Sequence, residues 1–140
     1  MLELLAPAGS PEAVTAAVQN GADAVYMGFG SFNARQNAKN FTKEELSSSI
    51  KYCHIRGAKV YVTLNTLVSD RELPDAIALA AEAAECGADA VLVQDLGILR
   101  GIKQAIPDLV LHASTQMSIH NSLGANLAYE MGASRVVAAR

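Results

Sequence analysis

A repeated glycine-alanine motif organises this 140-residue chain. It occurs in the segments NGADAVYMG (20–28), RGAKVYVTLN (56–65), CGADAVLVQD (86–95) and MGASRVVAAR (131–140). In each segment, Gly-Ala is followed after one or two residues by a short run rich in valine. Glycine at this place is typical of a helix that ends in the left-handed conformation. A short β-branched run without alternation is typical of a parallel strand that is buried on both faces. The repeat therefore predicts helices that each lead into a strand of a parallel sheet.

Helical signals fill the intervals between these runs. Ser10-Pro11-Glu12 is a typical helix start, and Thr42 to Glu45 and Ser69 to Glu72 have the spacing of a capping box. The predicted strands cover 2–6, 23–28, 58–64, 89–94, 109–113 and 134–139. The predicted helices cover 10–20, 43–56, 71–86, 97–105 and 119–131.

Strict alternation of strands and helices predicts an α/β fold with a parallel sheet and right-handed crossovers. Two architectures compete, a (β/α)8 TIM-type barrel and an open doubly wound sheet. The first strand-to-helix turn, APAGSPE, lacks the G-x-G-x-x-G of a dinucleotide site, and the regular repeat favours the barrel. About six β-α units are visible, whereas a barrel has eight strands and typically about 250 residues. We therefore expect residues 1–140 to be the N-terminal part of one barrel domain. The open edge of such a fragment would favour self-association.

Composition excludes several other classes of protein. The formal net charge of −3 gives no basic field for unspecific nucleic-acid binding by this segment. No apolar stretch approaches the roughly 20 residues that cross a bilayer, and MLELLAPAGS does not have the pattern of a signal peptide. A cytoplasmic protein without membrane contact is expected. Cys53 and Cys86 form no C-x-x-C pair, so neither a disulfide framework nor a zinc site is predicted.

Polar residues gather after the predicted strands, where parallel α/β folds carry their functional groups. The loop GFGSFNARQNAKNF (28–41) is longer than a usual strand-to-helix connection. Arg35, between Asn33 and Asn40, could clamp a carboxylate or a phosphate. The alternative is a solvated loop held by its own amides. Asn65, after the third strand, is a candidate for orienting a ligand, whereas Asp23 and Asp89, at the opposite strand ends, are interpreted as structural.

The fourth and fifth strands end in groups that could move a proton. Asp95, after Gln94, could be an acid, a base, a metal ligand or the cap of the next helix. The stretch LHASTQMSIHN (111–121) contains His112 and His120, but no G-x-S-x-G elbow and no H-E-x-x-H spacing. Ser118 is predicted to cap the following helix. Substrate positioning from this turn is the remaining interpretation, with His112 as a possible proton-transfer group.

The chain resembles the N-terminal barrel portion of the collagenase-like peptidase family, peptidase family U-32. The resemblance is carried in order by ELLAPAGSPEA, NGADAVYMG, FNARQNAKNF, VYVTLNTL, DAVLVQDLG, HASTQMSIHN and RVVAAR. It implies a full-length enzyme similar to oxygen-independent hydroxylases of tRNA bases, rRNA bases or quinone precursors. The family's iron–sulfur cluster is bound by cysteines beyond this segment, so no cofactor is expected here. Prephenate is implied as a hydroxyl source.

The leading hypothesis is hydroxylation of a tRNA or rRNA base by the full-length protein, with the isolated fragment inactive. The polar set after the strands would hold a small anionic co-substrate or the flipped base, and RNA contacts would come from the remainder of the protein. A peptidase and a non-catalytic binding or scaffold domain are the alternatives. No metal ligand is predicted. The predicted catalytic residues are His112 and Asp95, and the predicted substrate-binding residues are Asn33, Arg35, Asn40, Asn65, Gln94, Ser114, Thr115, Gln116, His120 and Arg140.

Overall fold

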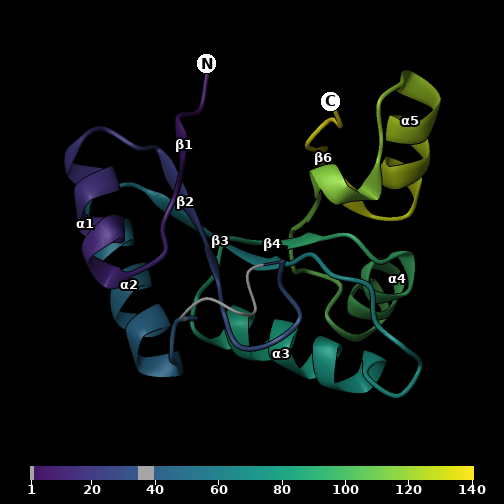
Figure 1. Ribbon diagram of the computed structural model, residues 1–140, viewed down its shortest axis with the longest axis horizontal. Coiled ribbons are helices and arrows are strands. Elements are labelled where there is room, and N and C mark those ends of the chain that lie inside the picture. Colours follow the sequence, from purple (N-terminus) through teal and green to yellow (C-terminus); the bar gives the residue numbers. More distant parts are fainter. Residues whose placement is uncertain (1, 35–39) are drawn as a thin grey trace.

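The structure is a computed structural model that describes residues 2–34 and 40–140. Strands and helices alternate along these residues, as the sequence predicts (Figure 1). The strands are β1 (Leu5–Pro7), β2 (Ala24–Gly28), β3 (Lys59–Leu64), β4 (Ala90–Val93), β5 (Leu111–Ala113) and β6 (Ala133–Val136). The helices are α1 (Pro11–Gln19), α2 (Lys43–Ile55), α3 (Leu73–Glu85), α4 (Leu96–Ala105), the 3-10 turn η1 (Thr115–Met117) and α5 (Ser122–Glu130).

The six strands form one parallel sheet in the order β1-β2-β3-β4-β5-β6. A doubly wound sheet reverses its strand order at a switch point, and this sheet does not. Each new strand is added on the same side, which is the winding of a (β/α)8 barrel. The sheet curls, with helices α1 to α4 on its outer side (Figure 1). The prediction of six units of a TIM-type barrel is confirmed, and the doubly wound alternative is wrong.

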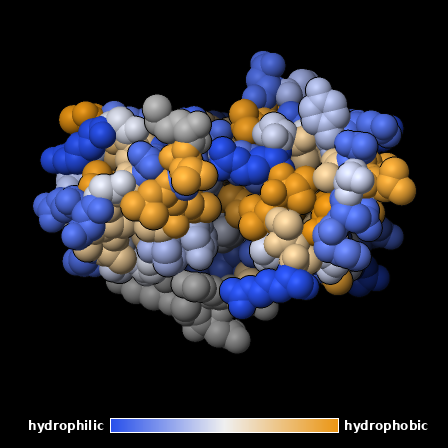
Figure 2. Space-filling view, turned by 90° about the horizontal axis from the view of Figure 1, so that it is seen from above, coloured by the Kyte–Doolittle hydropathy of each residue, from blue (hydrophilic) through white to orange (hydrophobic). Residues whose placement is uncertain are grey.

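The main core lies between the sheet and the helices. Alternate strand residues such as Val25, Val60 and Val91 are fully buried there. Small residues of α3, including Ala80 and Ala83, are also fully buried and allow the helix to pack closely on the sheet. The opposite set of strand residues points to the inner face and forms a second, smaller cluster of Ala24, Tyr61, Ala90 and Leu92. Seen from above, the molecule is hollowed, with apolar residues on both sides of the hollow (Figure 2). The valine-rich runs are therefore buried on one face and line the interior on the other.

The glycines of the repeat end the helices in the left-handed conformation, as predicted. Gly21, Gly57, Gly87 and Gly132 have φ of 92°, 75°, 98° and 111°. The aspartates that follow two of them connect neighbouring strands at the amino ends. Asp23 accepts a hydrogen bond from the backbone of Leu4 (2.7 Å), and Asp89 accepts one from Val60 (2.7 Å). The structural interpretation of both aspartates is confirmed.

Two of the predicted helix starts differ from the structure. Ser118 is not a helix cap: η1 occupies the residues before it, and Ser118 itself turns the chain with φ of 60°. This turn delays α5, which Asn121 caps by accepting a hydrogen bond from Gly124 N (2.9 Å). At α3, the Ser69 hydroxyl donates to the Glu72 carboxylate instead of accepting from its amide. Only the capping box of Thr42 and Glu45 forms in full.

Strand bounds differ by one to three residues at the two edges of the sheet. β1 begins at Leu5, and β6 runs from Ala133 to Val136. Each edge strand has one neighbour in the described chain, so fewer of its residues find a ladder partner. None of the described helices combines the length and the apolar character needed to cross a membrane.

Candidate functional site

Two adjoining cavities lie at the carboxyl ends of the strands. One, of about 180 Å³, is bordered by the ends of β1, β2 and β3 and by the loop after β2. The other, of about 340 Å³, extends over the inner face to the turn after β5. They share Tyr26, Thr63 and Asn65, and we call the combined space the cleft. Its polar lining residues are Tyr26, Asn33, Asn40, Thr63, Asn65, Ser114, Thr115 and Gln116.

Strand alternation decides which residues reach the cleft. On β2 and β3, Val25, Met27 and Val62 belong to the outer core. The intervening residues Tyr26 and Thr63 therefore point inward. Asn65 continues this inward set just past the end of β3. The sheet thus places a ring, a hydroxyl and an amide next to one another on two adjacent strands.

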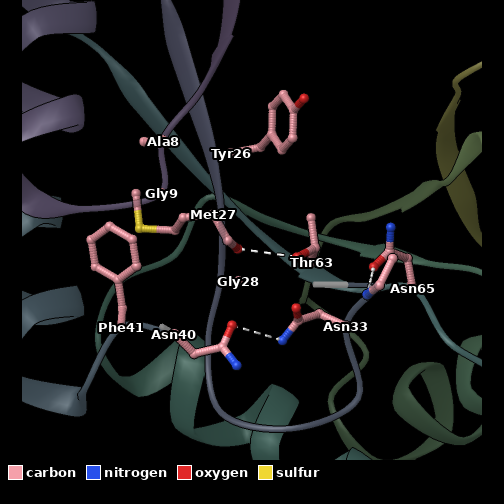
Figure 3. A pocket seen from close by; sticks show the side chains of 11 residues that line it. Ala8, Gly9, Tyr26, Met27, Gly28, Asn33, Asn40, Phe41, Thr63 and Asn65 are labelled. Carbon is pink, nitrogen blue, oxygen red and sulfur yellow. Dashed lines mark hydrogen bonds between the residues drawn. The ribbon is translucent and has the colours of Figure 1, made fainter. Parts of the chain in front are cut away.

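Asparagine amides hold the loop that follows β2 (Figure 3). Asn33, only 1% exposed, donates through Nδ2 to the Gly30 carbonyl and to Asn40 Oδ1, both at 3.2 Å. Asn65 Oδ1 accepts a hydrogen bond from Ala34 N at 3.0 Å. The loop therefore shows the bonding of the amide-held alternative, and the same three amides line the cleft.

Gly28 makes this arrangement possible. A Cβ at this position would lie 2.7 Å from Asn40 Oδ1 and 2.9 Å from Asn33 Oδ1. These separations are shorter than real carbon–oxygen contacts. The two amides can thus close over β2 only because residue 28 has no side chain.

The turn after β5 supplies the far side of the cleft. Ser114, 3% exposed, donates its hydroxyl hydrogen to Gln116 Oε1 at 3.4 Å. Thr115 and Gln116 are exposed in η1 and line the larger cavity. The structure therefore brings together Asn33, Asn40, Asn65, Ser114, Thr115 and Gln116, all of which were predicted to lie in one site.

Asp95 caps helix α4. Its Oδ1 accepts a hydrogen bond from Ile98 N (3.0 Å), and its Oδ2 accepts a longer one from Val68 N (3.4 Å). It borders neither cavity of the cleft. Of the roles that the sequence left open, capping is the one with visible contacts, and a proton-transfer role stays a prediction.

Substitution of Asp95 separates these two roles. Asp95→Ala should lower the free energy of unfolding by about 1 kcal/mol because the first turn of α4 loses its cap. Asp95→Asn keeps an oxygen acceptor for Ile98 N and loses only the longer bond from Val68 N, so we expect a smaller loss of stability than in Asp95→Ala and near wild-type activity. Urea unfolding and a turnover assay on the full-length variants measure both. Loss of turnover in a stably folded Asp95→Asn variant would instead favour acid–base chemistry.

His112 lies on the inner face of the sheet next to the cleft, but it borders neither cavity. Its ring is 5% exposed and meets the Tyr61 ring edge-on, with 4.8 Å between centroids. Burial, assisted by the positive charge of Arg135, lowers the His112 pKa to about 4. The imidazole is neutral at pH 7 and is a weak base there, far from the pKa that suits general-base catalysis near neutral pH. Its proton-transfer role stays a prediction.

An ion pair lies on the same inner face. Arg135 Nη1 donates to Glu3 Oε1 at 2.6 Å, and Tyr61 donates its hydroxyl hydrogen to Glu3 Oε2 at 2.9 Å. The bond from Arg135 lowers the Glu3 pKa, while burial and the bond to Glu3 raise the Tyr61 pKa. A bulge between β5 and β6 sets Arg135 opposite His112. This cluster connects the two edges of the sheet and was not predicted.

Three other predicted site residues, His120, Gln94 and Arg140, lie apart from the cleft. His120 is exposed and contacts the Ser118 carbonyl through Nδ1 (3.2 Å). Gln94 is half-buried and Arg140 is exposed, and neither borders a cavity of the cleft. Arg35 lies outside the described residues, so the anion clamp stays a prediction. The binding roles of all four stay predictions as well.

Tyr26, Gly28 and Thr63 were missed as cleft residues. The strand assignment was correct, but the inward and outward sets were not separated. Counting in steps of two back from Asn65 would have identified Thr63 and Tyr61 as inward residues. On β2 the same count places Gly28 and Tyr26 on the same, inward face of the strand. The alternation of residues along each strand therefore distinguishes the inward-facing set from the outward-facing set. The distinction is hard to see in the sequence because both sets are largely apolar.

The described residues contain no group of three His, Cys, Asp or Glu side chains arranged to hold a metal ion. Cys53 is fully buried in the outer core, and burial raises the pKa of its thiol to about 11. Cys86, also a free thiol, follows α3 and packs against the same core. Cluster ligation needs accessible thiolates. Cys53 therefore does not fit an iron–sulfur cluster, and Cys86 alone cannot supply the several thiolates that a cluster needs.

Comparison with known proteins gives a consistent family relationship. Residues 9–140 match the model of peptidase family U32. The chain is 42% identical to a 23S rRNA 5-hydroxycytidine synthase of Escherichia coli and 35% identical to tRNA hydroxylation protein P1 of Bacillus subtilis, with 99% of the chain covered in each case. It spans only 21% and 33% of the length of these curated relatives. A solved U32 peptidase structure superposes with a TM-score of 0.77 at 16% identity, covering 99% of this chain and 58% of that one, which shows the shared fold.

Proposed function

Because this chain belongs to peptidase family U32, we propose that the protein of which it forms part is an enzyme that hydroxylates a base of tRNA or rRNA. The observation that carries the proposal is a cleft of amides and hydroxyls on a chain 42% identical to an rRNA-modifying synthase. The cleft occupies the end of the sheet where barrel enzymes hold their substrates. This chain would then supply part of the substrate pocket.

The chemistry of the cleft favours this function over peptide hydrolysis. A serine or threonine nucleophile needs a base within hydrogen-bond reach. Ser114 donates to an amide oxygen of Gln116, and Thr63 donates to the Met27 carbonyl (3.3 Å). No histidine is among the described lining residues. The cleft is thus equipped to bind and orient a ligand, and the described lining contains no nucleophile–base pair.

The remaining parts of the reaction are assigned to the rest of the protein. We propose that an iron–sulfur cluster is bound by cysteines outside this segment, since Cys53 and Cys86 do not fit one. A small anionic co-substrate would provide the hydroxyl group. RNA contacts would come from other regions, because this chain has a net charge of −3. A cytoplasmic location, where tRNA and rRNA are accessible, is part of the same proposal.

Mass spectrometry of nucleosides tests the proposal. Total tRNA and rRNA from a strain lacking the gene should lose one hydroxylated pyrimidine nucleoside, and the full-length gene should restore it. An empty vector is the matched control. If no nucleoside changes and the purified full-length protein cleaves gelatin in a His112-dependent manner, the enzyme is a peptidase and the hydroxylase proposal is wrong.

A further inference from the structure

The described lining of the cleft carries no charged side chain. Its polar groups belong to asparagine, glutamine, serine, threonine and tyrosine. Sites for phosphates and carboxylates are typically built from arginine or lysine, which form charge-assisted hydrogen bonds. Amides instead present a donor and an acceptor side by side. The hydrogen-bond donors and acceptors of this lining suit a neutral ligand that itself carries neighbouring carbonyl and N–H groups.

Asn65 presents an oriented donor to that ligand. Its Oδ1 is occupied by Ala34 N (3.0 Å), which fixes the amide orientation. Its Nδ2 points away from Ala34 (Figure 3) and has no hydrogen-bond partner among the described residues. Asn65 borders both cavities, so this free donor lies where they join. A carbonyl oxygen of a ligand could accept the hydrogen bond that Asn65 Nδ2 offers.

Tyr26 adds an aromatic surface to the same place. It points inward from β2, is only partly buried, and borders both cavities together with Asn65. Its hydroxyl has no hydrogen-bond partner in the described part of the chain. Aromatic side chains that are free at a cleft are typical platforms for unstacked bases. The larger cavity, about 340 Å³, falls within the usual size range of sites for small molecules.

We propose that the cleft binds the pyrimidine base that is modified, and not the anionic co-substrate. Asn65 Nδ2 donates a hydrogen bond to a ring carbonyl, and the Tyr26 ring lies against the base. This assignment rests on the proposed RNA-base function and identifies the ligand of this part of the site. It leaves the anion to residues outside the described lining of the cleft, among which Arg35 stays the predicted clamp.

Calorimetric titration of the full-length protein tests the assignment. The probes are uridine and cytidine as neutral ligands, and inorganic phosphate and malonate as anions. At least one nucleoside should bind. Asn65→Asp replaces the free donor by an oxygen while the other oxygen still accepts from Ala34 N, so nucleoside affinity should fall about tenfold or more. Tyr26→Leu should also weaken it, and neither variant should change anion affinity.

Asn121→Asp is the matched control. Asn121 also accepts a backbone hydrogen bond through Oδ1, from Gly124 N at 2.9 Å, but it borders neither cavity. The same change in charge there should leave nucleoside affinity unaltered. The assignment is overturned if neither nucleoside binds, if Asn65→Asp and Asn121→Asp behave alike, or if only anion affinity falls.

These outcomes are separable from failure of the proposed reaction. Suppose that nucleosides bind in an Asn65-dependent manner, but the deletion strain loses no hydroxylated nucleoside. This result would support the cleft assignment and reject the proposed reaction. A hydroxylated nucleoside that disappears, with Asn65→Asp as active as wild type on its RNA, would reject the cleft assignment alone.

Discussion

The free energy of unfolding should fall by about 3 kcal/mol as the pH drops from 6.5 to 4, through the titration of His112 alone. Burial in the folded protein lowers the His112 pKa to about 4 from its ordinary 6.5. Between these values the unfolded chain binds a proton that the folded one does not. Protonation therefore favours unfolding, and stability increases with pH across this window.

The variant His112→Gln should flatten this pH dependence, because glutamine has no charge at any pH. Urea unfolding at a series of pH values from 5.5 to 7 measures the effect above the range in which Glu3 contributes, since the Glu3 carboxyl takes up a proton in the unfolded chain only near its ordinary pKa of 4.5 and Arg135 lowers its pKa further in the folded protein. His120→Gln, which changes an exposed histidine, is the control. Equal slopes in His112→Gln and wild type would show that the imidazole is not the source of acid sensitivity.

Gly28→Ala should destabilise the fold by about 1 to 3 kcal/mol and disrupt the cleft. The added methyl group would need the space now occupied by Asn33 Oδ1 and Asn40 Oδ1. These amides are bonded to each other, so moving one displaces the other and the loop that both hold. We expect the proposed hydroxylation of RNA by the full-length protein to fall at least tenfold, since displacements of about 1 Å have effects of this size.

Gly9→Ala provides a stability control on the adjacent strand end. A Cβ at Gly9 would find no atom within 4 Å, although this glycine also borders the smaller cavity. Thermal unfolding of both variants compares the same chemical change with and without steric conflict. If Gly28→Ala and Gly9→Ala are equally stable, Asn33 and Asn40 can move to accommodate the methyl group, and the predicted steric conflict is wrong.

Most of the fold could be predicted because its determinants are local. A glycine at the ends of α1, α2, α3 and α5 and a valine-rich run after it specify the helix-to-strand unit whatever surrounds it. The starts of α3 and α5 were less predictable, since Ser69 and Ser118 can bond in several ways. Serine hydroxyls compete for nearby backbone groups with little energetic difference. The remainder of the chain decides which bond forms.

The candidate site was predictable only in part. Asn33, Asn65 and Ser114 were identified because parallel strands place their carboxyl ends at one edge. Tyr26 and Thr63 lie earlier on their strands and reach the cleft because they belong to the inward-facing set of strand residues. Asp95, in contrast, was predicted as a site residue but borders neither cavity. Its position at a strand end suits both helix capping and proton transfer. Its hydrogen bonds to Ile98 and Val68 appear only in three dimensions.

Local patterns in the chain are enough to specify the repeating unit, its parallel direction and the edge that carries polar groups, because each follows from neighbouring residues. Which residues meet on the inner face depends on contacts between distant parts of the chain. Arg135 reaches Glu3, 132 positions away, because the bulge at β5 and β6 shifts the alternation by one residue. Without that shift, Arg135 would point to the helices. The charge of Arg135, placed beside His112 by the same shift, helps burial to lower the His112 pKa.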